Sequence, residues 1–187
     1  MRPGHRYESF NTSDGVEVTL RTLRKADLET ALDFINDLVA ERRTNREFGV
    51  MADTKATRKT EKEFLEKVTR GLKENNTASV AAFEGKKLIG NCEEHRDRFK
   101  DAKHHGYLGM AIRRGYRGKG IGERMMRYVL RTCKVIGLKS VQLEVFANNT
   151  PARNLYGKMG FRQVGMIPRK IRRRGLVTDS ILIVAEL

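Results

Sequence analysis

The feature that most constrains the fold of this chain is a glycine-rich segment, residues 112–122, which reads Ile-Arg-Arg-Gly-Tyr-Arg-Gly-Lys-Gly-Ile-Gly. It follows a predicted strand over 105–112 and precedes a predicted helix. The helix is indicated by apolar residues that share one face and is ended by Gly137: Ile121, Met125, Val129, Cys133 and Ile136. Backbone amides and the positive end of a helix dipole converge where a strand turns through glycines into a helix. Arg117 and Lys119 add positive charge, so the segment predicts a phosphate site.

Two familiar phosphate loops do not match this segment. A nucleoside-triphosphate loop requires Lys and then Ser or Thr after its last glycine, whereas Ile121 and Gly122 follow Gly120 here. A dinucleotide fingerprint requires a glycine three residues after its second one, and Glu123 occupies that position. The segment therefore holds another kind of phosphate, or it is only a flexible turn between a strand and a helix.

Alternating and helical apolar patterns divide the rest of the chain into strands and helices. Strands are predicted over 17–22, 79–83, 87–93, 141–146, 162–167 and 180–185, and helices over 28–39, 60–72 and 150–160, with a polar loop over 43–57. Asp27 is the predicted N-cap of the first helix, and Thr60 with Glu63 has capping-box spacing for the second. With the elements around the glycine-rich segment, the order is βααβββαβαββ. It predicts an α/β (α+β) fold, a mixed central sheet of about seven strands flanked by helices.

The length of 187 residues fits one domain, which we expect over 16–187 after a flexible N-terminal segment over 1–15. No stretch is apolar for long enough to cross a bilayer, so we expect a soluble, cytoplasmic protein without membrane association. Cys92 and Cys133 lack CxxC spacing, and the adjacent His104 and His105 would point to opposite faces of a strand. We therefore expect neither a disulfide nor a metal site.

The formal net charge of +15 favours contacts with phosphates, nucleic acids or acidic proteins. The densest basic run is Arg169, Lys170, Arg172, Arg173 and Arg174. Its simplest interpretation is a solvated hairpin loop, and the alternative is a site for an anion or a partner. The sequence leaves the role of this basic run open.

Two blocks of residues resemble one family. Arg117-Gly-Lys-Gly-Ile-Gly122 resembles the Arg/Gln-x-x-Gly-x-Gly/Ala pyrophosphate loop of the GCN5-related N-acetyltransferases, the GNAT family. The second block of that family, Asn-x-x-Ala-x-x-x-Tyr then Gly-Phe, is similar to a set of residues after Leu143-Glu144-Val145: Asn149, Ala152, Leu155, Tyr156 and Gly160-Phe161. The resemblance covers residues 16–187 and is firmest over 108–161. Glu144 matches the subgroup that acetylates the N-termini of ribosomal proteins.

This resemblance implies an acyltransferase that uses acetyl-CoA as cosubstrate and needs no metal. In the family, the pantetheine arm lies between two splayed strands, here 108–112 and 141–146, and it pairs with the first of them. The implied cofactor contacts are Met110, Ala111 and Ile112 on that strand, and Arg117, Gly118, Lys119, Gly120, Ile121 and Gly122 at the diphosphate. Asn149 matches an asparagine that braces the cofactor or the backbone, although asparagine is also common in turns.

The resemblance also implies which side chains carry the chemistry. Tyr156 matches the general acid that protonates the departing thiolate, and its alternative role is packing beside Leu155. Glu144 is the candidate general base that takes the proton of the amine, with a water molecule as the alternative. Glu93 and Glu94, on the preceding strand, could also serve, and their alternative role is that of exposed charges on a strand. The strand before the loop lacks the glutamate that the family carries there.

The sequence does not specify the acceptor, which we expect to be a small-molecule amine, a protein N-terminus or a lysine. Acidic residues on the first two helices would receive a cationic amine, whereas the hairpin over 168–178 would receive an acidic protein. Two other classes compete: a basic nucleic-acid-binding protein, which lacks support from any RNA-binding sheet signature, and a non-catalytic acetyl-CoA-binding protein. Nucleic acid is not expected as a substrate, and the oligomeric state, including a homodimer, is open.

Overall fold

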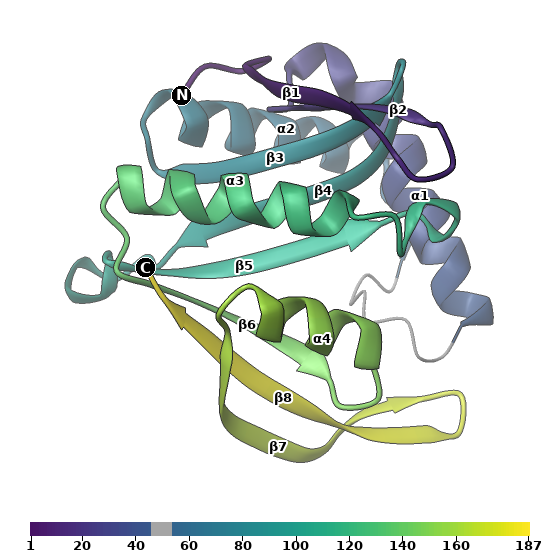
Figure 1. Cartoon of the computed structure of the whole chain (residues 1–187), viewed down its shortest axis with the longest axis vertical. Coiled ribbons are helices and arrows are strands. Elements are labelled where there is room, and N and C mark those ends of the chain that lie inside the picture. Colours follow the sequence, from purple (N-terminus) through teal and green to yellow (C-terminus); the bar gives the residue numbers. More distant parts are fainter. Residues whose placement is uncertain (46–53) are drawn as a thin grey trace.

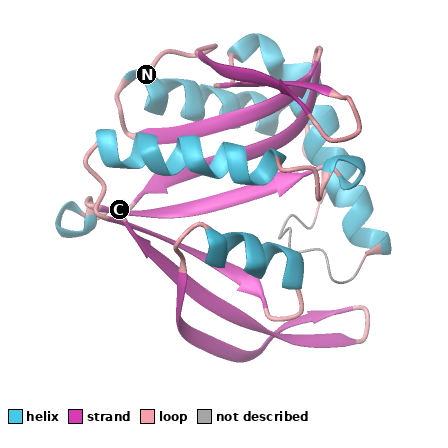
Figure 2. Ribbon diagram, viewed as in Figure 1, coloured by secondary structure: helices cyan, strands magenta, loops and turns pink. Residues whose placement is uncertain are grey.

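A computed structural model describes residues 1–45 and 54–187, and these residues form one sheet of eight strands with four α-helices (Figures 1 and 2). In chain order the elements are β1 (Arg6–Asn11), β2 (Glu17–Arg21), α1 (Leu28–Thr44), α2 (Arg58–Lys73), β3 (Thr77–Glu84), β4 (Lys87–Arg96), β5 (His105–Ile112), α3 (Ile121–Val135), β6 (Ser140–Phe146), α4 (Thr150–Lys158), β7 (Arg162–Arg173) and β8 (Leu176–Glu186). The predicted α/β class and mixed central sheet are confirmed.

The strands lie in the order β1-β2-β3-β4-β5-β6-β8-β7, and every neighbouring pair is antiparallel except β5 and β6. That parallel pair needs a crossover, which α3 supplies. The β5–β6 ladder begins at His105 and ends at Tyr107, which lies opposite Gln142. Beyond that pair the two strands diverge, as Figure 1 shows.

The helices cover both faces of the sheet, with α3 and α4 on the near face in Figure 1 and α1 and α2 behind. Because side chains alternate along a strand, each face has its own apolar core. Val80 and Cys92 belong to the core under α3 and α4, whereas Ala81 and Leu88 belong to the core under α1 and α2. None of the helices in the described ranges is long and apolar enough to cross a bilayer.

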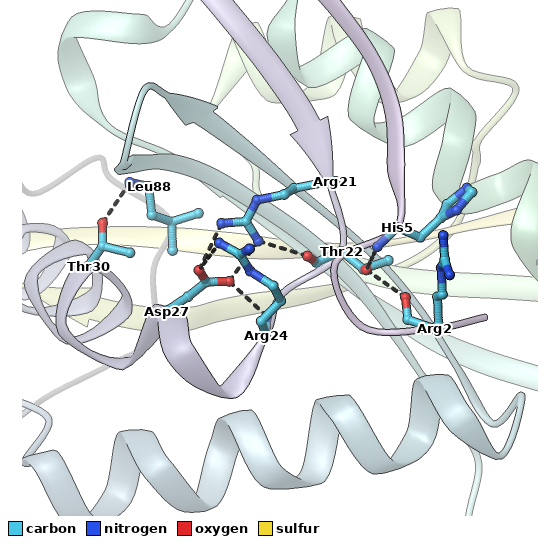
Figure 3. Close-up of polar contacts among 8 residues, drawn as sticks. All are labelled: Arg2, His5, Arg21, Thr22, Arg24, Asp27, Thr30 and Leu88. Atoms are coloured by element: carbon cyan, nitrogen blue, oxygen red, sulfur yellow. Dashed lines mark hydrogen bonds and ion pairs between the residues drawn. The ribbon is translucent and has the colours of Figure 1, made fainter.

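A buried carboxylate joins α1 to the sheet (Figure 3). Arg21 donates from Nη1 and Nη2 to the Asp27 oxygens at 2.7 and 2.8 Å, and the Arg24 amide donates to the same carboxylate at 2.8 Å. Asp27 occupies the predicted N-cap position of α1, but its side chain makes no capping hydrogen bond to that helix, because the carboxylate is bonded to Arg21 and to the Arg24 amide. The Thr30 hydroxyl accepts from the Leu88 amide at 2.8 Å and fixes α1 against β4. A smaller set of contacts in Figure 3 links Arg2, His5 and Thr22.

Three local predictions need correction. Residues 6–11, expected in a flexible segment, form β1 and pair with β2, so the sheet has eight strands and not seven. The N-cap of α2 is Thr57, which accepts from the Thr60 amide, so the capping box begins three residues earlier than predicted. The polar loop predicted over 43–57 begins later, because α1 extends to Thr44; its residues 46–53 lie outside the described residues.

The basic run is also not a loop. Four of its members lie on β7, and only Arg174, together with Gly175, forms the turn to β8. Ile171 faces Thr178 in the ladder, and both Ile171 and Arg173 are buried. Burial at alternate positions, as for Ile171 and Arg173, is typical of a strand, whereas a solvated loop would leave these side chains exposed.

Candidate active site

A cavity of about 810 Å³ opens where β5 and β6 diverge. Its walls come from both faces of the sheet: Gly118, Gly120, Gly122, Ala152, Leu155 and Tyr156 on the side of α3 and α4, and Phe34, Ile35, Glu61, Phe64 and Glu93 on the side of α1, α2 and β4. Residues 108–112 of β5 and 143–146 of β6 lie between the two sets. The cavity therefore passes through the sheet, so two molecules could enter from opposite faces and meet at the gap.

The glycine-rich loop forms one end of this cavity. Gly118 and Gly120 have φ of 74° and 79°, a left-handed conformation that side chains with a Cβ rarely adopt, and Gly120 is the N-cap of α3. Glycine is favoured at position 122 for a different reason, namely lack of space: a Cβ there would lie 3.1 Å from Leu155 Cδ2 and 3.2 Å from Ile112 Cδ1. The first two glycines thus shape the turn, and the third lets α3 pack closely on α4 and β5.

The cationic side chains of the loop are paired with acidic residues from other parts of the chain. Arg117 donates to both Glu41 carboxylate oxygens, at 2.6 and 2.5 Å, and to the Ile112 carbonyl at 2.8 Å. Lys119 Nζ lies 2.6 Å from Asp14 Oδ2 in the turn between β1 and β2. Arg117 therefore anchors the loop to α1, and an anion at this end would meet chiefly backbone amides and the dipole of α3.

Most of the predicted cofactor residues line the cavity: Met110, Ala111, Ile112, Arg117, Gly118, Gly120, Gly122, Asn149 and Tyr156. Two others lie elsewhere. Lys119 is paired with Asp14, and Ile121 is buried in the core beneath α3. Asn149 caps α4, since its Oδ1 accepts from the Ala152 amide at 3.3 Å, so it serves local structure as well as facing the cavity.

Tyr156 lies on α4 at the α3 and α4 side of the cavity and is only 7% exposed. Its ring packs on Phe161 with centroids 5.8 Å apart, and its hydroxyl makes no hydrogen bond within the described residues. Burial raises the pKa of Tyr156 well above its usual range, and the nearby Cys92 adds to that shift. The phenol is therefore protonated at neutral pH, as a proton donor must be.

Glu144 lies on the opposite side of the gap. Val141, Leu143 and Val145 belong to the core under α3, so the alternating Glu144 points to the other face of the sheet. It contacts Lys170 and accepts from the Ser180 hydroxyl at 2.6 Å. These two donors, Lys170 first, lower the pKa of Glu144, which makes its carboxylate a weaker base.

Two polar residues of the cavity wall, Asn148 and Glu61, were not predicted as site residues. The side-chain nitrogen and oxygen of Asn148 are buried without a partner in the described part of the chain. Glu61, on α2, is 7% exposed, and burial together with the charge of Glu93 raises its pKa to about 7. A signal for Glu61 was present, because it precedes Leu65 and Val68 by four and seven residues and so lies on the inward stripe of α2.

Comparison with known proteins agrees with this geometry. The model of the acetyltransferase (GNAT) family matches residues 38–161. YwnH of Bacillus subtilis (strain 168), for which phosphinothricin acetyltransferase activity is proposed, is 26% identical over 181 residues, covering 91% of this chain and 99% of YwnH.

Two solved structures share the fold. Ribosomal-protein-alanine N-acetyltransferase from Brucella melitensis has a TM-score of 0.76 at 18% identity and covers 90% of this chain and 99% of its own. The proposed acetyltransferase yncA from Salmonella typhimurium, solved with its cofactor acetyl-CoA, has a TM-score of 0.77 at 15% identity and covers 91% of this chain and 94% of its own. The resemblance inferred from the two sequence blocks is thereby confirmed: this chain belongs to the acetyltransferase (GNAT) family and is an acyltransferase.

Proposed function

We propose that this chain transfers the acetyl group of acetyl-CoA to a primary amine, with both substrates bound at once. The observation that carries the proposal is the cavity through the sheet, with amides at the head of α3 on one side and carboxylates on the other. The relative yncA supports acetyl-CoA as the donor, because its structure was solved with that cofactor.

The residues of the cavity fit such a donor. The left-handed Gly118 and Gly120 and the helix terminus form a turn of backbone amides suited to a diphosphate, and a Cβ added to either glycine would meet no atom within 4 Å. Residues 108–112 present strand backbone that has lost its β6 partner, and an amide-containing arm could pair with it. Bound acetyl-CoA would supply a thioester carbonyl at the gap.

The proposed chemistry needs a proton donor and a proton acceptor on opposite sides of that carbonyl. An ammonium group has no free electron pair, so the amine must lose a proton before its nitrogen can bond to the acetyl carbon. Glu144, on the far face, is the proposed acceptor of that proton, directly or through water. Tyr156, on the α4 side, is the proposed donor to the sulfur as the carbon–sulfur bond breaks. The two roles match the two faces on which these side chains lie.

Release of free thiol from acetyl-CoA, measured with a panel of polyamines, amino acids, aminoglycosides and peptides with free N-termini, tests the proposal. We expect Tyr156→Phe to lower kcat by about 10² or more with the best acceptor, because it removes a general acid without changing the packing. Glu144→Gln should lower kcat by a smaller factor, since Lys170 and Ser180 already lower the pKa of Glu144 and so weaken it as a base. Coenzyme binding without thiol release for any amine would instead indicate a non-catalytic binding protein, and an unchanged rate in Tyr156→Phe would remove the phenol from the mechanism.

A further inference from the structure

We propose that Glu61 and Glu93 form a cation-binding subsite at the α1 and α2 end of the cavity, and that the acceptor is an amine with a second positively charged group. This inference rests on the proposed function, because it names the class of amine that the same cavity would take. It also decides between the two acceptor classes that the sequence left open, in favour of a cation.

The position of the two carboxyl groups is the first argument. Glu93 on β4 lies directly opposite Gly109 on β5, two residues beyond the last β5–β6 pair at Tyr107. Opposite residues of an antiparallel pair project to the same face, and a Cβ added to Gly109 would meet no atom within 4 Å. Glu93 therefore borders open space at the gap. Glu61 faces the same cavity from α2 and is close enough for the Glu93 charge to act on it.

The second argument is that the Glu61 carboxyl group and one oxygen of Glu93 lack partners among the described residues. Glu61 is 7% exposed, yet its carboxyl group makes no hydrogen bond or ion pair with any residue in the described ranges 1–45 and 54–187. Glu93 Oε1 lies 3.2 Å from His95 Nε2, but Glu93 Oε2 is buried and has no partner among those same residues. Buried carboxyl groups are normally paired, because removing a charge from water is costly unless a cation or donor replaces the lost hydration. A ligand with a positive charge would supply that replacement.

Other acidic side chains near the cavity are already neutralised. Asp33 and Asp37 on α1 both pair with Arg113, at 2.5 and 2.8 Å. Glu41 pairs with Arg117 in the glycine-rich loop. Glu144 contacts Lys170, so one of the basic residues of β7 is likewise engaged. Among the carboxyl groups that line the cavity in the described part of the structure, Glu123 and Glu144 each contact a lysine, whereas Glu61 and Glu93 do not.

The surroundings favour a flexible organic cation over a bare metal ion. Phe34, Ile35 and Phe64 provide apolar wall next to the carboxyl groups, which suits the methylene chain of an alkyl diamine. A small metal ion would require more oxygen or nitrogen ligands than this pair supplies. An acceptor that carries a carboxylate would be repelled by both glutamates.

Three amines that share one skeleton test this subsite: 1,5-diaminopentane, hexylamine and 6-aminohexanoate each join a primary amine through five methylenes to an ammonium, a methyl or a carboxylate group. We expect kcat/KM to fall in that order. Glu61→Gln keeps the shape but removes the charge, so the ratio of kcat/KM for the diamine to that for hexylamine should fall at least about tenfold. Glu63→Gln, which removes the same charge from the exposed side of α2, is the matched control and should leave the ratio unchanged.

Calorimetric titration of 1,5-diaminopentane into the protein loaded with CoA separates this inference from the proposed function. Binding that weakens in Glu61→Gln and not in Glu63→Gln supports the subsite even if no amine is acetylated, and in that case only the enzymatic proposal fails. Equal kcat/KM for the three amines, a preference for 6-aminohexanoate, or no measurable diamine binding to CoA-loaded protein overturns the subsite. Retained CoA affinity in Glu61→Gln shows that the variant is folded.

Discussion

Glu94 makes the stability of this protein depend on pH in a direction opposite to that of most carboxylates. The side chain is fully buried on β4, beneath α3, and Oε2 accepts a 3.3 Å hydrogen bond from the Ala78 amide, while Oε1 has no partner in the described structure. Burial raises the pKa of Glu94 from 4.5 to about 7, although the Ala78 amide and the charge of Arg96 oppose the shift. Its position is tight, since a Cβ on Gly106 would lie 2.3 Å from Oε1.

The sign of the effect follows from proton counting. Between the unfolded pKa of 4.5 and the folded pKa of about 7, the native chain holds a proton on Glu94 that the unfolded chain has lost. The free energy of unfolding therefore falls as pH rises through this window. The shift of about 2.5 pKa units corresponds to about 3 kcal/mol, which is present at low pH and lost above neutrality.

Glu94→Gln isolates this contribution, because glutamine has the shape of the protonated acid but cannot ionise. Urea unfolding followed by far-ultraviolet circular dichroism at about pH 5 and about pH 9 gives four free energies, and any constant cost of the buried amide cancels in their comparison. We expect the loss of stability between the two pH values to be smaller by about 3 kcal/mol in the variant. The exposed Glu63→Gln is the control. Equal losses in wild type and Glu94→Gln would refute the assignment of a buried, ionisable Glu94.

Two further substitutions test the loop and the junction of α1 with the sheet. Gly120→Val should abolish CoA binding in calorimetry while far-ultraviolet circular dichroism stays native, because φ of 79° strains a β-branched residue at the head of α3; equal affinity would place the diphosphate elsewhere. Asp27→Asn should lower the free energy of unfolding by about 3–5 kcal/mol, since it leaves the mostly buried Arg21 without its charged partner, whereas Asp101→Asn at an exposed site should have little effect. A change below about 1 kcal/mol would contradict a structural role for this ion pair.

Local sequence patterns were enough to predict the elements next to the gap between β5 and β6. The predicted strand over 105–112 coincides with β5, and the predicted helix stripe from Ile121 coincides with α3. The apolar stripe of α3 has the helical period and lies between Gly120 and Gly137, and β5 leads directly into the glycine-rich segment, so neighbouring residues alone specify both elements. The predicted strand over 141–146 likewise differs from β6 by a single residue at its start.

Features that depend on residues far away in the sequence could not be predicted in the same way. β1 is an edge strand whose residues Tyr7 and Phe10 show no strict alternation, and its backbone pairs only with β2. Arg117 was expected to add charge for a phosphate, but its partner Glu41 is 76 residues away in the sequence. Charged side chains with several donors take whichever acceptor the tertiary fold places beside them, and no local pattern encodes that choice.

The proposed cation subsite is compatible with the high positive net charge of the chain. A formal charge of +15 suggests an anionic partner, but charges separated by more than about 8–10 Å are largely screened at physiological salt, so the groups lining a cavity decide what binds inside it. In this fold the gap between β5 and β6 separates two environments: amides and a helix N-terminus on the α3 side, and Glu61 with Glu93 on the α2 side. If both proposals hold, this positively charged protein binds a polyanionic coenzyme at one face of the sheet and a cationic amine at the other, because the residues lining each side of the gap differ in charge.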